Sequence, residues 1–416
     1  MTTTTTERYQ SIDAVRGFAV LGILLMNIVG MGLPTFAYVS PAYWGGHTGA
    51  DLWAWAINYV LSDGKFRGLF TMLFGASMLL ITDRAEGRNP GPAATHYRRV
   101  WWLFVIGMLH AYFLFFGDIL VTYALAGALV FPLRKLGPKT LIGIGVAVLL
   151  ALLGKDLFEV IYIKAVQTAV AAGTATPGQT DIWTSAQLLL NAPRSMGEEE
   201  IRLMRGGFLE ALQSRAQASW IIQTQFMPTE EIPEAVGQML IGAGLFRLGF
   251  FTLGWSSRAY ARMVAVGYLV GVPVTAWLAW KTVQVDFEPV ARRLFEVLTA
   301  IPRPLIALAH ASLLMLVIRS GAVKALVSRL EAAGRMAFSN YLSTSIITSF
   351  VFCGYGLGLY GQLHRAELYW VVLAVWAFIL LWSKPWLARF HYGPFEWLWR
   401  SLVMGKPQPF VKRTAG

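Results

Sequence analysis

The chain has 416 residues, of which 56% are apolar and only 14% are charged, with a mean hydropathy of +0.53. Soluble domains carry about 25% charged residues, so this composition excludes an ordinary water-soluble globule. The net charge of +12 could favour nucleic acid in a soluble protein, but here the basic residues flank apolar segments and more simply contact lipid headgroups. The single cysteine, Cys353, excludes an internal disulfide and a Cys-ligated iron–sulfur cluster.

Ten apolar segments follow one another along the chain, and most are long enough to cross a bilayer as a helix. They lie near residues 13–33, 66–82, 100–116, 119–133, 140–163, 234–254, 262–281, 303–318, 336–356 and 368–388. The sequence therefore predicts an all-α, polytopic transmembrane helix bundle with about ten spanning helices.

The distribution of charge predicts how this bundle is oriented. Basic residues concentrate in every second loop, for example at Arg98 and Arg99 and at Arg134 and Lys135. Cytoplasmic loops are the ones enriched in Lys and Arg, so we expect both termini to be cytoplasmic.

The same segmentation predicts one integral membrane domain in three parts. Residues 1–163 should form a five-helix membrane region with a first outside loop. Residues 164–232 should form an extracytoplasmic loop whose helical stretch, about 198–221, lies on the membrane surface as an amphipathic cap. Residues 233–416 should form a C-terminal membrane region that ends in an interfacial helix.

His110 and Asp118 are the candidate catalytic residues. An ionisable side chain within a bilayer segment is costly, and His110 lies inside the third segment, with Asp118 in the turn that follows. A histidine exchanges protons near neutral pH, and a carboxylate can orient it as a general base. The structural alternatives are that His110 bonds to a helix carbonyl and that Asp118 caps the fourth helix.

Three other residues are candidates for binding an anionic cofactor or donor. Arg16 lies near the cytoplasmic end of the first segment, where it could meet a phosphate, pair with Asp13 or extend to the headgroups. Asn27 lies about three turns deeper, and a buried amide needs a partner. Arg247 lies near the cytoplasmic end of the sixth segment, where headgroup contact is the alternative.

Six polar residues near segment ends or in the first outside loop are candidates for substrate binding: Lys65, Arg67, His47, Asp51, Asn340 and Tyr341. Helix anchoring is the alternative for the two cations, and an exposed loop histidine usually has no special role. No Walker A sequence, Gly-x-Ser-x-Gly turn or metal-ligand cluster is present. We therefore expect no metal, haem or flavin.

Five pieces of the chain together resemble a known family. They are DAVRGFAVLGILLMN at 13–27, KFRGLFTMLFG at 65–75, GMLHAYFLFFGDIL at 107–120, GRMAFSNY at 334–341 and GPFEWLWR at 393–400. The combination resembles the YeiB-like family of bacterial inner-membrane proteins, domain of unknown function 418, over almost the whole chain. That family is grouped with transmembrane acyltransferases such as heparan-alpha-glucosaminide N-acetyltransferase and the acyltransferase-three family. The resemblance implies the bacterial inner membrane and acyl transfer from cytoplasmic acyl-CoA.

The chain departs from these relatives at their reactive histidines. The acyltransferase-three pattern has an Arg, ten residues and then a catalytic His, whereas this chain has Arg16 and then Asn27. The heparan enzyme uses a His in its first lumenal loop. His47 lies in the corresponding loop, but its spacing to Asp51 does not match. His110 is therefore the preferred catalytic residue, although the analogy does not point to it.

The leading hypothesis is an acyltransferase that moves an acyl group, such as acetyl, from cytoplasmic acyl-CoA to an extracytoplasmic sugar, lipid or small amphiphile. His110 and Asp118 would activate the acceptor. The alternative is a proton-coupled transporter or exporter of a small amphiphilic metabolite, in which the same pair relays protons. Membrane lipids and a small-molecule acceptor are the expected partners, nucleic acid is not, and the oligomeric state is left open, with a homodimer as one option.

Overall fold

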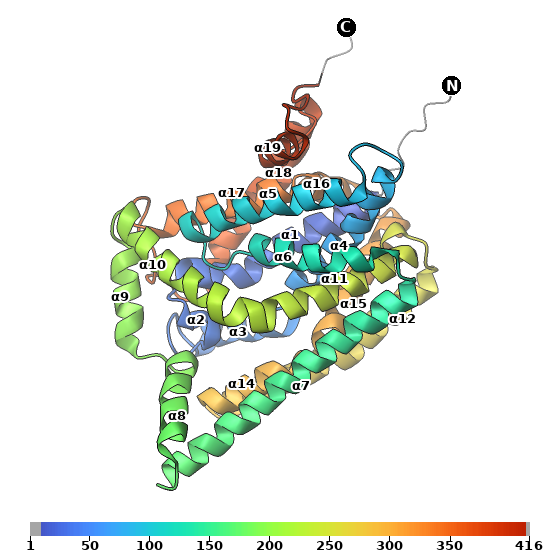
Figure 1. The fold of residues 1–416 in the computed structure, drawn as a ribbon. Coiled ribbons are helices and arrows are strands. Elements are labelled where there is room, and N and C mark those ends of the chain that lie inside the picture. Colours follow the sequence, from blue (N-terminus) through green and yellow to red (C-terminus); the bar gives the residue numbers. More distant parts are fainter. Residues whose placement is uncertain (1–9, 413–416) are drawn as a thin grey trace, which may run out of the picture.

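The structure is a computed structural model that describes residues 10–412. These residues form helices, turns and loops without a β-strand, and one isolated bridge pairs Phe390 with Val411. The predicted all-α fold is confirmed (Figure 1).

The helical elements follow one another along the chain with short connections. In chain order they are α1 (Gln10–Gly32), α2 (Phe36–Val39), α3 (Gly49–Leu61), α4 (Lys65–Ala85), α5 (Pro92–Phe113), α6 (Leu120–Val130), η1 (Phe131–Lys135), α7 (Pro138–Ala171), α8 (Pro177–Leu190), α9 (Arg194–Met204), α10 (Phe208–Ile221), η2 (Ile222–Glu231), α11 (Ile232–Arg247), η3 (Phe250–Thr252), α12 (Ser257–Val266), η4 (Gly267–Gly271), α13 (Val272–Gln284), α14 (Pro289–Leu298), α15 (Pro302–Ser320), α16 (Lys324–Arg335), α17 (Ala337–Phe352), α18 (Leu368–Arg389) and α19 (Pro394–Met404). Each of the ten predicted apolar segments is helical over most of its length.

Six helical stretches of residues 10–412 are long and apolar enough to cross a membrane. They are Gln10–Gly32, Gly49–Ala85, Pro138–Ala171, Ser257–Gln284, Pro302–Ser320 and Leu368–Arg389. The other four predicted segments form α5, α6, α11 and α17, which do not reach the same length and hydropathy. The helices are those of a membrane protein, while the count of ten spans and the cytoplasmic position of both termini stay predictions.

Helix α1 is the centre of the bundle. Its apolar stretch is 83% buried, and it contacts α4, α15, α16, α17 and α18. Its closest neighbour is α16, because glycines remove the side chains between the two backbones. A Cβ on Gly334 would lie 1.8 Å from the Asp13 carbonyl oxygen, and a Cβ on Gly17 would lie 2.0 Å from the Leu330 carbonyl oxygen. This close packing fixes the polar start of α1 beside the end of α16.

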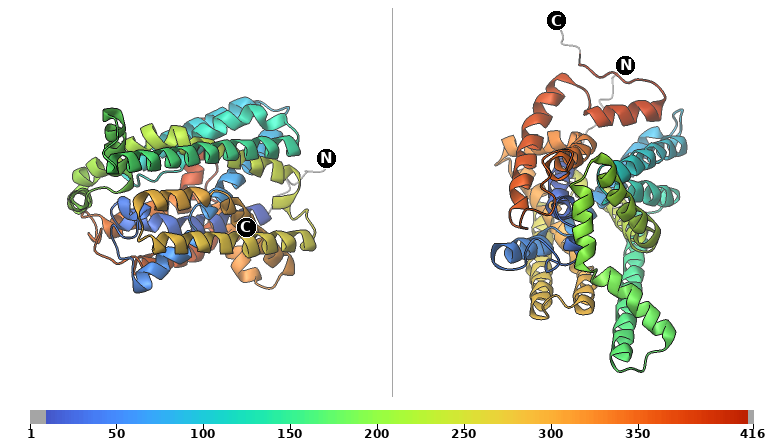
Figure 2. Two further views of the ribbon diagram at one scale, coloured as in Figure 1. Left: turned by 90° about the horizontal axis from the view of Figure 1, so that it is seen from below. Right: turned by 90° about the vertical axis from the view of Figure 1, so that its left-hand side faces the viewer.

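Helix α7 extends beyond the rest of the bundle. Figures 1 and 2 show it running past the other helices, with α8 returning from its far end. Its 34 residues correspond to about 51 Å, longer than a hydrocarbon core of about 30 Å. The helix therefore continues past the predicted end of its apolar segment, and α8 begins shortly after its far end.

The region predicted to hold one surface cap helix is built differently. The helix breaks at 205–207, which separates α9 from α10. Helix α10 then packs against α5 and continues through η2 into α11. Pro228 and Pro233 lack the amide hydrogen of a regular helix, yet the chain continues, with Pro228 inside the π-helical η2 and Pro233 in the first turn of α11. The structure therefore divides the predicted helical stretch in two and packs α10 against α5, while a position on the membrane surface stays a prediction.

The half-buried carboxylate of Glu200 holds helix α9 to the bundle. Glu200 accepts hydrogen bonds from the Thr35 amide at 3.0 Å, the Thr35 hydroxyl at 2.7 Å and the Tyr360 hydroxyl at 2.7 Å. Burial raises the pKa of Glu200, and these hydrogen bonds oppose the rise. The contact ties α9 to the chain after α1 and to the loop before α18.

Candidate functional site

His110 is held on both sides of its ring in the bundle interior. Its Nδ1 lies 2.7 Å from Asp118 Oδ1, and its Nε2 lies 2.8 Å from Ser345 Oγ. The three residues are buried, with exposed fractions of 2%, 5% and 1% for His110, Asp118 and Ser345. A carboxylate accepts hydrogen bonds, so a neutral ring carries its proton on Nδ1 and leaves Nε2 as the acceptor for Ser345. This is the tautomer that a general base requires.

Asp118 makes both of the contacts that the sequence left open. Its Oδ2 accepts a hydrogen bond from the Val121 amide at 2.8 Å, which caps the first turn of α6. Its Oδ1 contacts His110 at the end of α5. The α5–α6 hairpin therefore brings the histidine and the carboxylate together, and the cap keeps the carboxylate in place.

A cavity of about 630 Å³ opens at the end of the bundle where α1 begins. Its lining comes from α1, α4, α5, α6, α16, α17 and α19. Five arginines line it against two carboxylates: Arg16, Arg84, Arg99, Arg335 and Arg400, with Asp13 and Glu396. The cavity is therefore basic, and it lies on the side predicted to be cytoplasmic.

The two carboxylates of the cavity already have partners within the protein. Asp13 Oδ1 lies 2.9 Å from Arg16, which also donates to Ser77 at 2.9 Å. Glu396 accepts hydrogen bonds from the Phe338 amide at 2.8 Å and from the amide and hydroxyl of Ser339. Burial raises the pKa of Glu396, while these hydrogen bonds at the start of α17 oppose the rise.

Two arginines of the cavity face aromatic rings. The Arg99 guanidinium lies 4.1 Å from the Trp399 ring centre, and the Arg400 guanidinium lies 4.6 Å from that of Tyr392. Within residues 10–412, no carboxylate is within ion-pair distance of either arginine. The i,i+4 spacing of Glu396 and Arg400 suggests an ion pair, but the structure directs Glu396 to α17 and leaves Arg400 toward the cavity.

Tyr341 lies between the cavity and His110. It lines the inner end of the cavity, and its ring centre lies 5.0 Å from that of His110. Its hydroxyl accepts a hydrogen bond from the Ile119 amide at 3.3 Å. Tyr341 therefore separates the basic cavity from the buried His110, Asp118 and Ser345.

Asn27 lies on the face of α1 that points toward the same region. Ile23, one turn earlier, packs in the cluster that contains Tyr341, and a Cβ on Gly30 would lie 3.2 Å from Phe116. Asn27 is half-buried, and its amide has no hydrogen-bond partner within residues 10–412. An unpaired amide at this depth is available to a ligand.

Four other predicted site residues make contacts that stabilise the packing of the helices and loops. Lys65 donates to the Tyr59 carbonyl, and Arg67 pairs with Glu234 at 2.8 Å. Arg247 donates to two backbone carbonyls that follow α6, and Asn340 donates to the Ala333 carbonyl and accepts from the Trp382 indole. None of these contacts joins the residue to His110.

His47 lies in the loop before α3 and Asp51 in the first turn of α3, where both contact neighbouring segments. The His47 ring packs edge-on against Phe287, with ring centres 6.0 Å apart. Asp51 accepts from the Ala366 amide at 2.9 Å and lies 3.3 Å from His364. The structure does not bring these two residues to the cavity or to His110.

Ser345 is the site residue that the sequence did not indicate. The available signal was the spacing of Tyr341, Ser345 and Thr348, which places three hydroxyls on one face of α17. The basic cavity was missed for another reason. Its arginines lie on five helices that are far apart in the chain, and of these arginines only Arg16 is a predicted binding residue.

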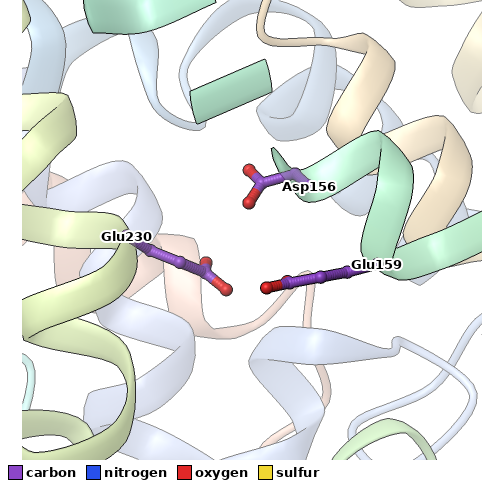
Figure 3. A group of neighbouring side chains, drawn as sticks. All are labelled: Asp156, Glu159 and Glu230. Atoms are coloured by element: carbon purple, nitrogen blue, oxygen red, sulfur yellow. The ribbon is translucent and has the colours of Figure 1, made fainter. Parts of the chain in front are cut away.

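Three carboxylates form a cluster that is separate from the basic cavity. Asp156 and Glu159 of α7 face Glu230 of η2 (Figure 3), and their oxygens lie within 4.8 Å of one another. Lys155 lies 3.1 Å from Asp156 and 3.0 Å from Glu159, and Arg293 lies 2.9 Å from Glu230. Two cations therefore partner these carboxylates, and we assign the cluster a structural role that joins α7, η2 and α14.

Comparison with known proteins places the chain in a family. The family described as a protein of unknown function (DUF418) matches residues 245–406. The uncharacterized protein YeiB of Escherichia coli (strain K12) is 33% identical over 98% of this chain and 100% of its own length. The uncharacterized protein YxaH of Bacillus subtilis (strain 168) is 28% identical over 99% of this chain and 98% of its own. No solved structure matches the chain. Identity of this degree over the full length shows that the chain belongs to the YeiB-like, DUF418 family.

Proposed function

We propose that the protein is a bacterial inner-membrane acyltransferase that takes an acyl group from cytoplasmic acyl-CoA and delivers it to an extracytoplasmic sugar, lipid or small amphiphile. The observation that carries the proposal is the position of His110, between Asp118 and Ser345, beneath the inner end of the basic cavity. A buried base next to a cavity for an anionic ligand is the arrangement that acyl transfer from a phosphate-bearing donor needs.

The cavity suits the donor in charge and size. Five arginines against two carboxylates favour a ligand with several phosphates, and guanidinium groups bind phosphate oxygens in pairs. A volume of about 630 Å³ lies within the range of small-molecule sites. The phosphates would lie among Arg16, Arg99 and Arg400, and the acyl end would point toward Tyr341.

The chemistry requires a base, an orienting group and a donor to the developing oxyanion. His110 supplies the base through Nε2, and Asp118 holds the ring and stabilises it when it becomes protonated. Asn27 is the candidate donor to the oxyanion, because its amide is unpaired within residues 10–412 and lies on the face of α1 toward this region.

The test uses inverted inner-membrane vesicles, which expose the cytoplasmic face to labelled acetyl-CoA and longer acyl-CoAs. We expect label to enter a lipid or glycan fraction and free CoA to appear at the same rate. His110→Ala should lower both by at least about 100-fold. His364→Ala is the matched control, because this histidine is 68% exposed and lies in an outer loop.

Proton-coupled transport is the competing outcome of this experiment. If no acyl-CoA loses its acyl group and a pH gradient instead drives uptake of an amphiphile that His110→Ala abolishes, the acyltransferase proposal is wrong.

A further inference from the structure

We propose that Ser345 is a nucleophile that carries the acyl group as a covalent ester between the donor and the acceptor. This inference rests on the proposed function and adds to it a second catalytic residue and a two-step course.

The Ser345 hydroxyl points away from its own helix backbone. Serine and threonine hydroxyls inside helices commonly return to the carbonyl four residues earlier. Thr344 and Thr348 of α17 do so, with Thr344 donating to the Asn340 carbonyl at 2.8 Å and Thr348 donating to that of Thr344 at 2.8 Å. The Ser345 hydroxyl instead has its only hydrogen bond within residues 10–412 to His110 Nε2. A hydroxyl directed at the free nitrogen of an oriented histidine is an activated nucleophile.

The order of the three groups is that of a catalytic triad. The hydroxyl meets Nε2 at 2.8 Å, and the carboxylate meets Nδ1 at 2.7 Å on the opposite side of the ring. This is the connectivity of a Ser-His-Asp triad, which occurs on unrelated folds and is defined by geometry rather than by sequence order. In this bundle α17, α5 and the turn before α6 supply the three groups.

Ser345 also lies between the two ends of the bundle. One turn earlier on α17, Tyr341 lines the basic cavity. One turn later, Thr348 and Ser349 line a small void with Arg215, near the end of α1. A covalent carrier at this midpoint can be loaded from one side and discharged to the other, so donor and acceptor need not meet. Tyr341, which closes the inner end of the cavity, has to move aside for loading.

The transfer takes two balanced steps. Ser345 Oγ passes its proton to His110 Nε2 and bonds to the thioester carbonyl carbon, the carbon–sulfur bond breaks, and the thiolate leaves with that proton as free CoA. The acceptor hydroxyl then gives its proton to Nε2 and bonds to the ester carbonyl carbon. The bond from that carbon to Ser345 Oγ breaks, and Oγ recovers the proton.

The experiment loads the purified full-length protein with labelled acetyl-CoA in the absence of an acceptor, quenches with acid and maps the label by mass spectrometry. We expect one acetyl group on the peptide that contains Ser345. Ser345→Ala should remove the label and lower CoA release by at least about 100-fold. Thr344→Ala is the control, next to Ser345 on the same helix with its hydroxyl on the Asn340 carbonyl, and it should retain the label.

A further variant distinguishes loss of the nucleophile in Ser345→Ala from loss of the fold. Ser345→Cys keeps a nucleophile of similar size and should carry the acetyl group as a thioester that neutral hydroxylamine releases. Unlabelled Ser345 in a wild-type protein that still transfers acetyl groups, or undiminished transfer by Ser345→Ala, would overturn the inference and leave His110 acting directly on the acceptor. If the wild-type protein neither binds acetyl-CoA nor releases CoA, the proposed function itself fails.

Discussion

The role of His110 depends on the contacts of its two ring nitrogens. The sequence indicates His110 and Asp118, because an ionisable group within an apolar segment is costly and the turn at Gly117 brings the two close. It does not indicate Ser345, because a hydroxyl in a helix costs little and usually bonds to its own backbone. Only the hydrogen bond to His110 on α5 distinguishes Ser345 from Thr344 or Thr348.

Asp118→Asn separates the two functions of this residue. An asparagine oxygen can still accept from the Val121 amide and cap α6, but it cannot stabilise a protonated His110. We expect CoA release to fall by about 10²–10⁴-fold, with a small change in thermal stability. Asp181→Asn, at an exposed position of α8, is the control. Unchanged turnover in Asp118→Asn would mean that the carboxylate serves only as a helix cap.

Glu200→Ala tests the attachment of α9. The substitution leaves the Thr35 amide and hydroxyl and the Tyr360 hydroxyl without their acceptor at a half-buried position. We expect a loss of about 1–3 kcal/mol in the free energy of unfolding, measured by denaturation in detergent. Glu198→Ala, on the exposed face of the same helix, should change stability little.

Comparing the wild type with Glu200→Ala at different pH values gives a further prediction. Burial raises the pKa of Glu200, so the folded state binds the proton more tightly than the unfolded state does. The stability that Glu200 adds is therefore complete below its ordinary pKa and declines as the pH rises through the raised value. The difference in melting temperature between wild type and Glu200→Ala should shrink over that interval, and a difference that grows with pH contradicts this assignment.

At the scale of the helices, the apolar segments predict where helices lie but not how they continue. Pro228 and Pro233 lie close to the predicted boundary between residues 232 and 233, yet the helical path continues past both, through the π-helical η2 and into the first turn of α11. The sequence also does not predict the close contact between α1 and α16, because Gly17 and Gly334 lie far apart in the chain.

Gly334→Ala tests that contact. The added methyl would lie 1.8 Å from the Asp13 carbonyl oxygen, so α1 and α16 must separate. Overpacking of this kind costs about 1–3 kcal/mol, and here it also displaces the lining of the cavity. We expect lower thermal stability and weaker binding of CoA. Gly143→Ala on α7, where a methyl meets nothing within 4 Å, should leave both unchanged.

At the scale of the whole molecule, the sequence predicts an orientation but does not predict the cavity. Alternating basic loops follow from composition alone, whereas the cavity gathers arginines from α1, α4, α5, α16 and α19. Contacts between residues so distant in the chain depend on the tertiary packing, which a single sequence does not reveal.

Cysteine accessibility tests the orientation. The single native cysteine, Cys353, is 1% exposed and should give little background. An impermeant maleimide should label Thr174→Cys, between α7 and α8, on intact cells. It should label Lys324→Cys, at the start of α16, only after the cells are permeabilised. The reverse pattern would place the basic cavity on the outside and exclude cytoplasmic acyl-CoA as its ligand.

The most direct test of the proposed function is the thermal stability of the purified protein with free CoA and acetyl-CoA. A ligand that binds only the folded state adds about 2.7 kcal/mol at a hundredfold excess over its dissociation constant. We expect both ligands to raise the melting temperature, Arg16→Ala and Arg400→Ala to abolish the shift, and His110→Ala to preserve it. No shift with millimolar CoA or acetyl-CoA, or a shift that both arginine variants retain, would contradict the assignment of the cavity to an acyl-CoA donor.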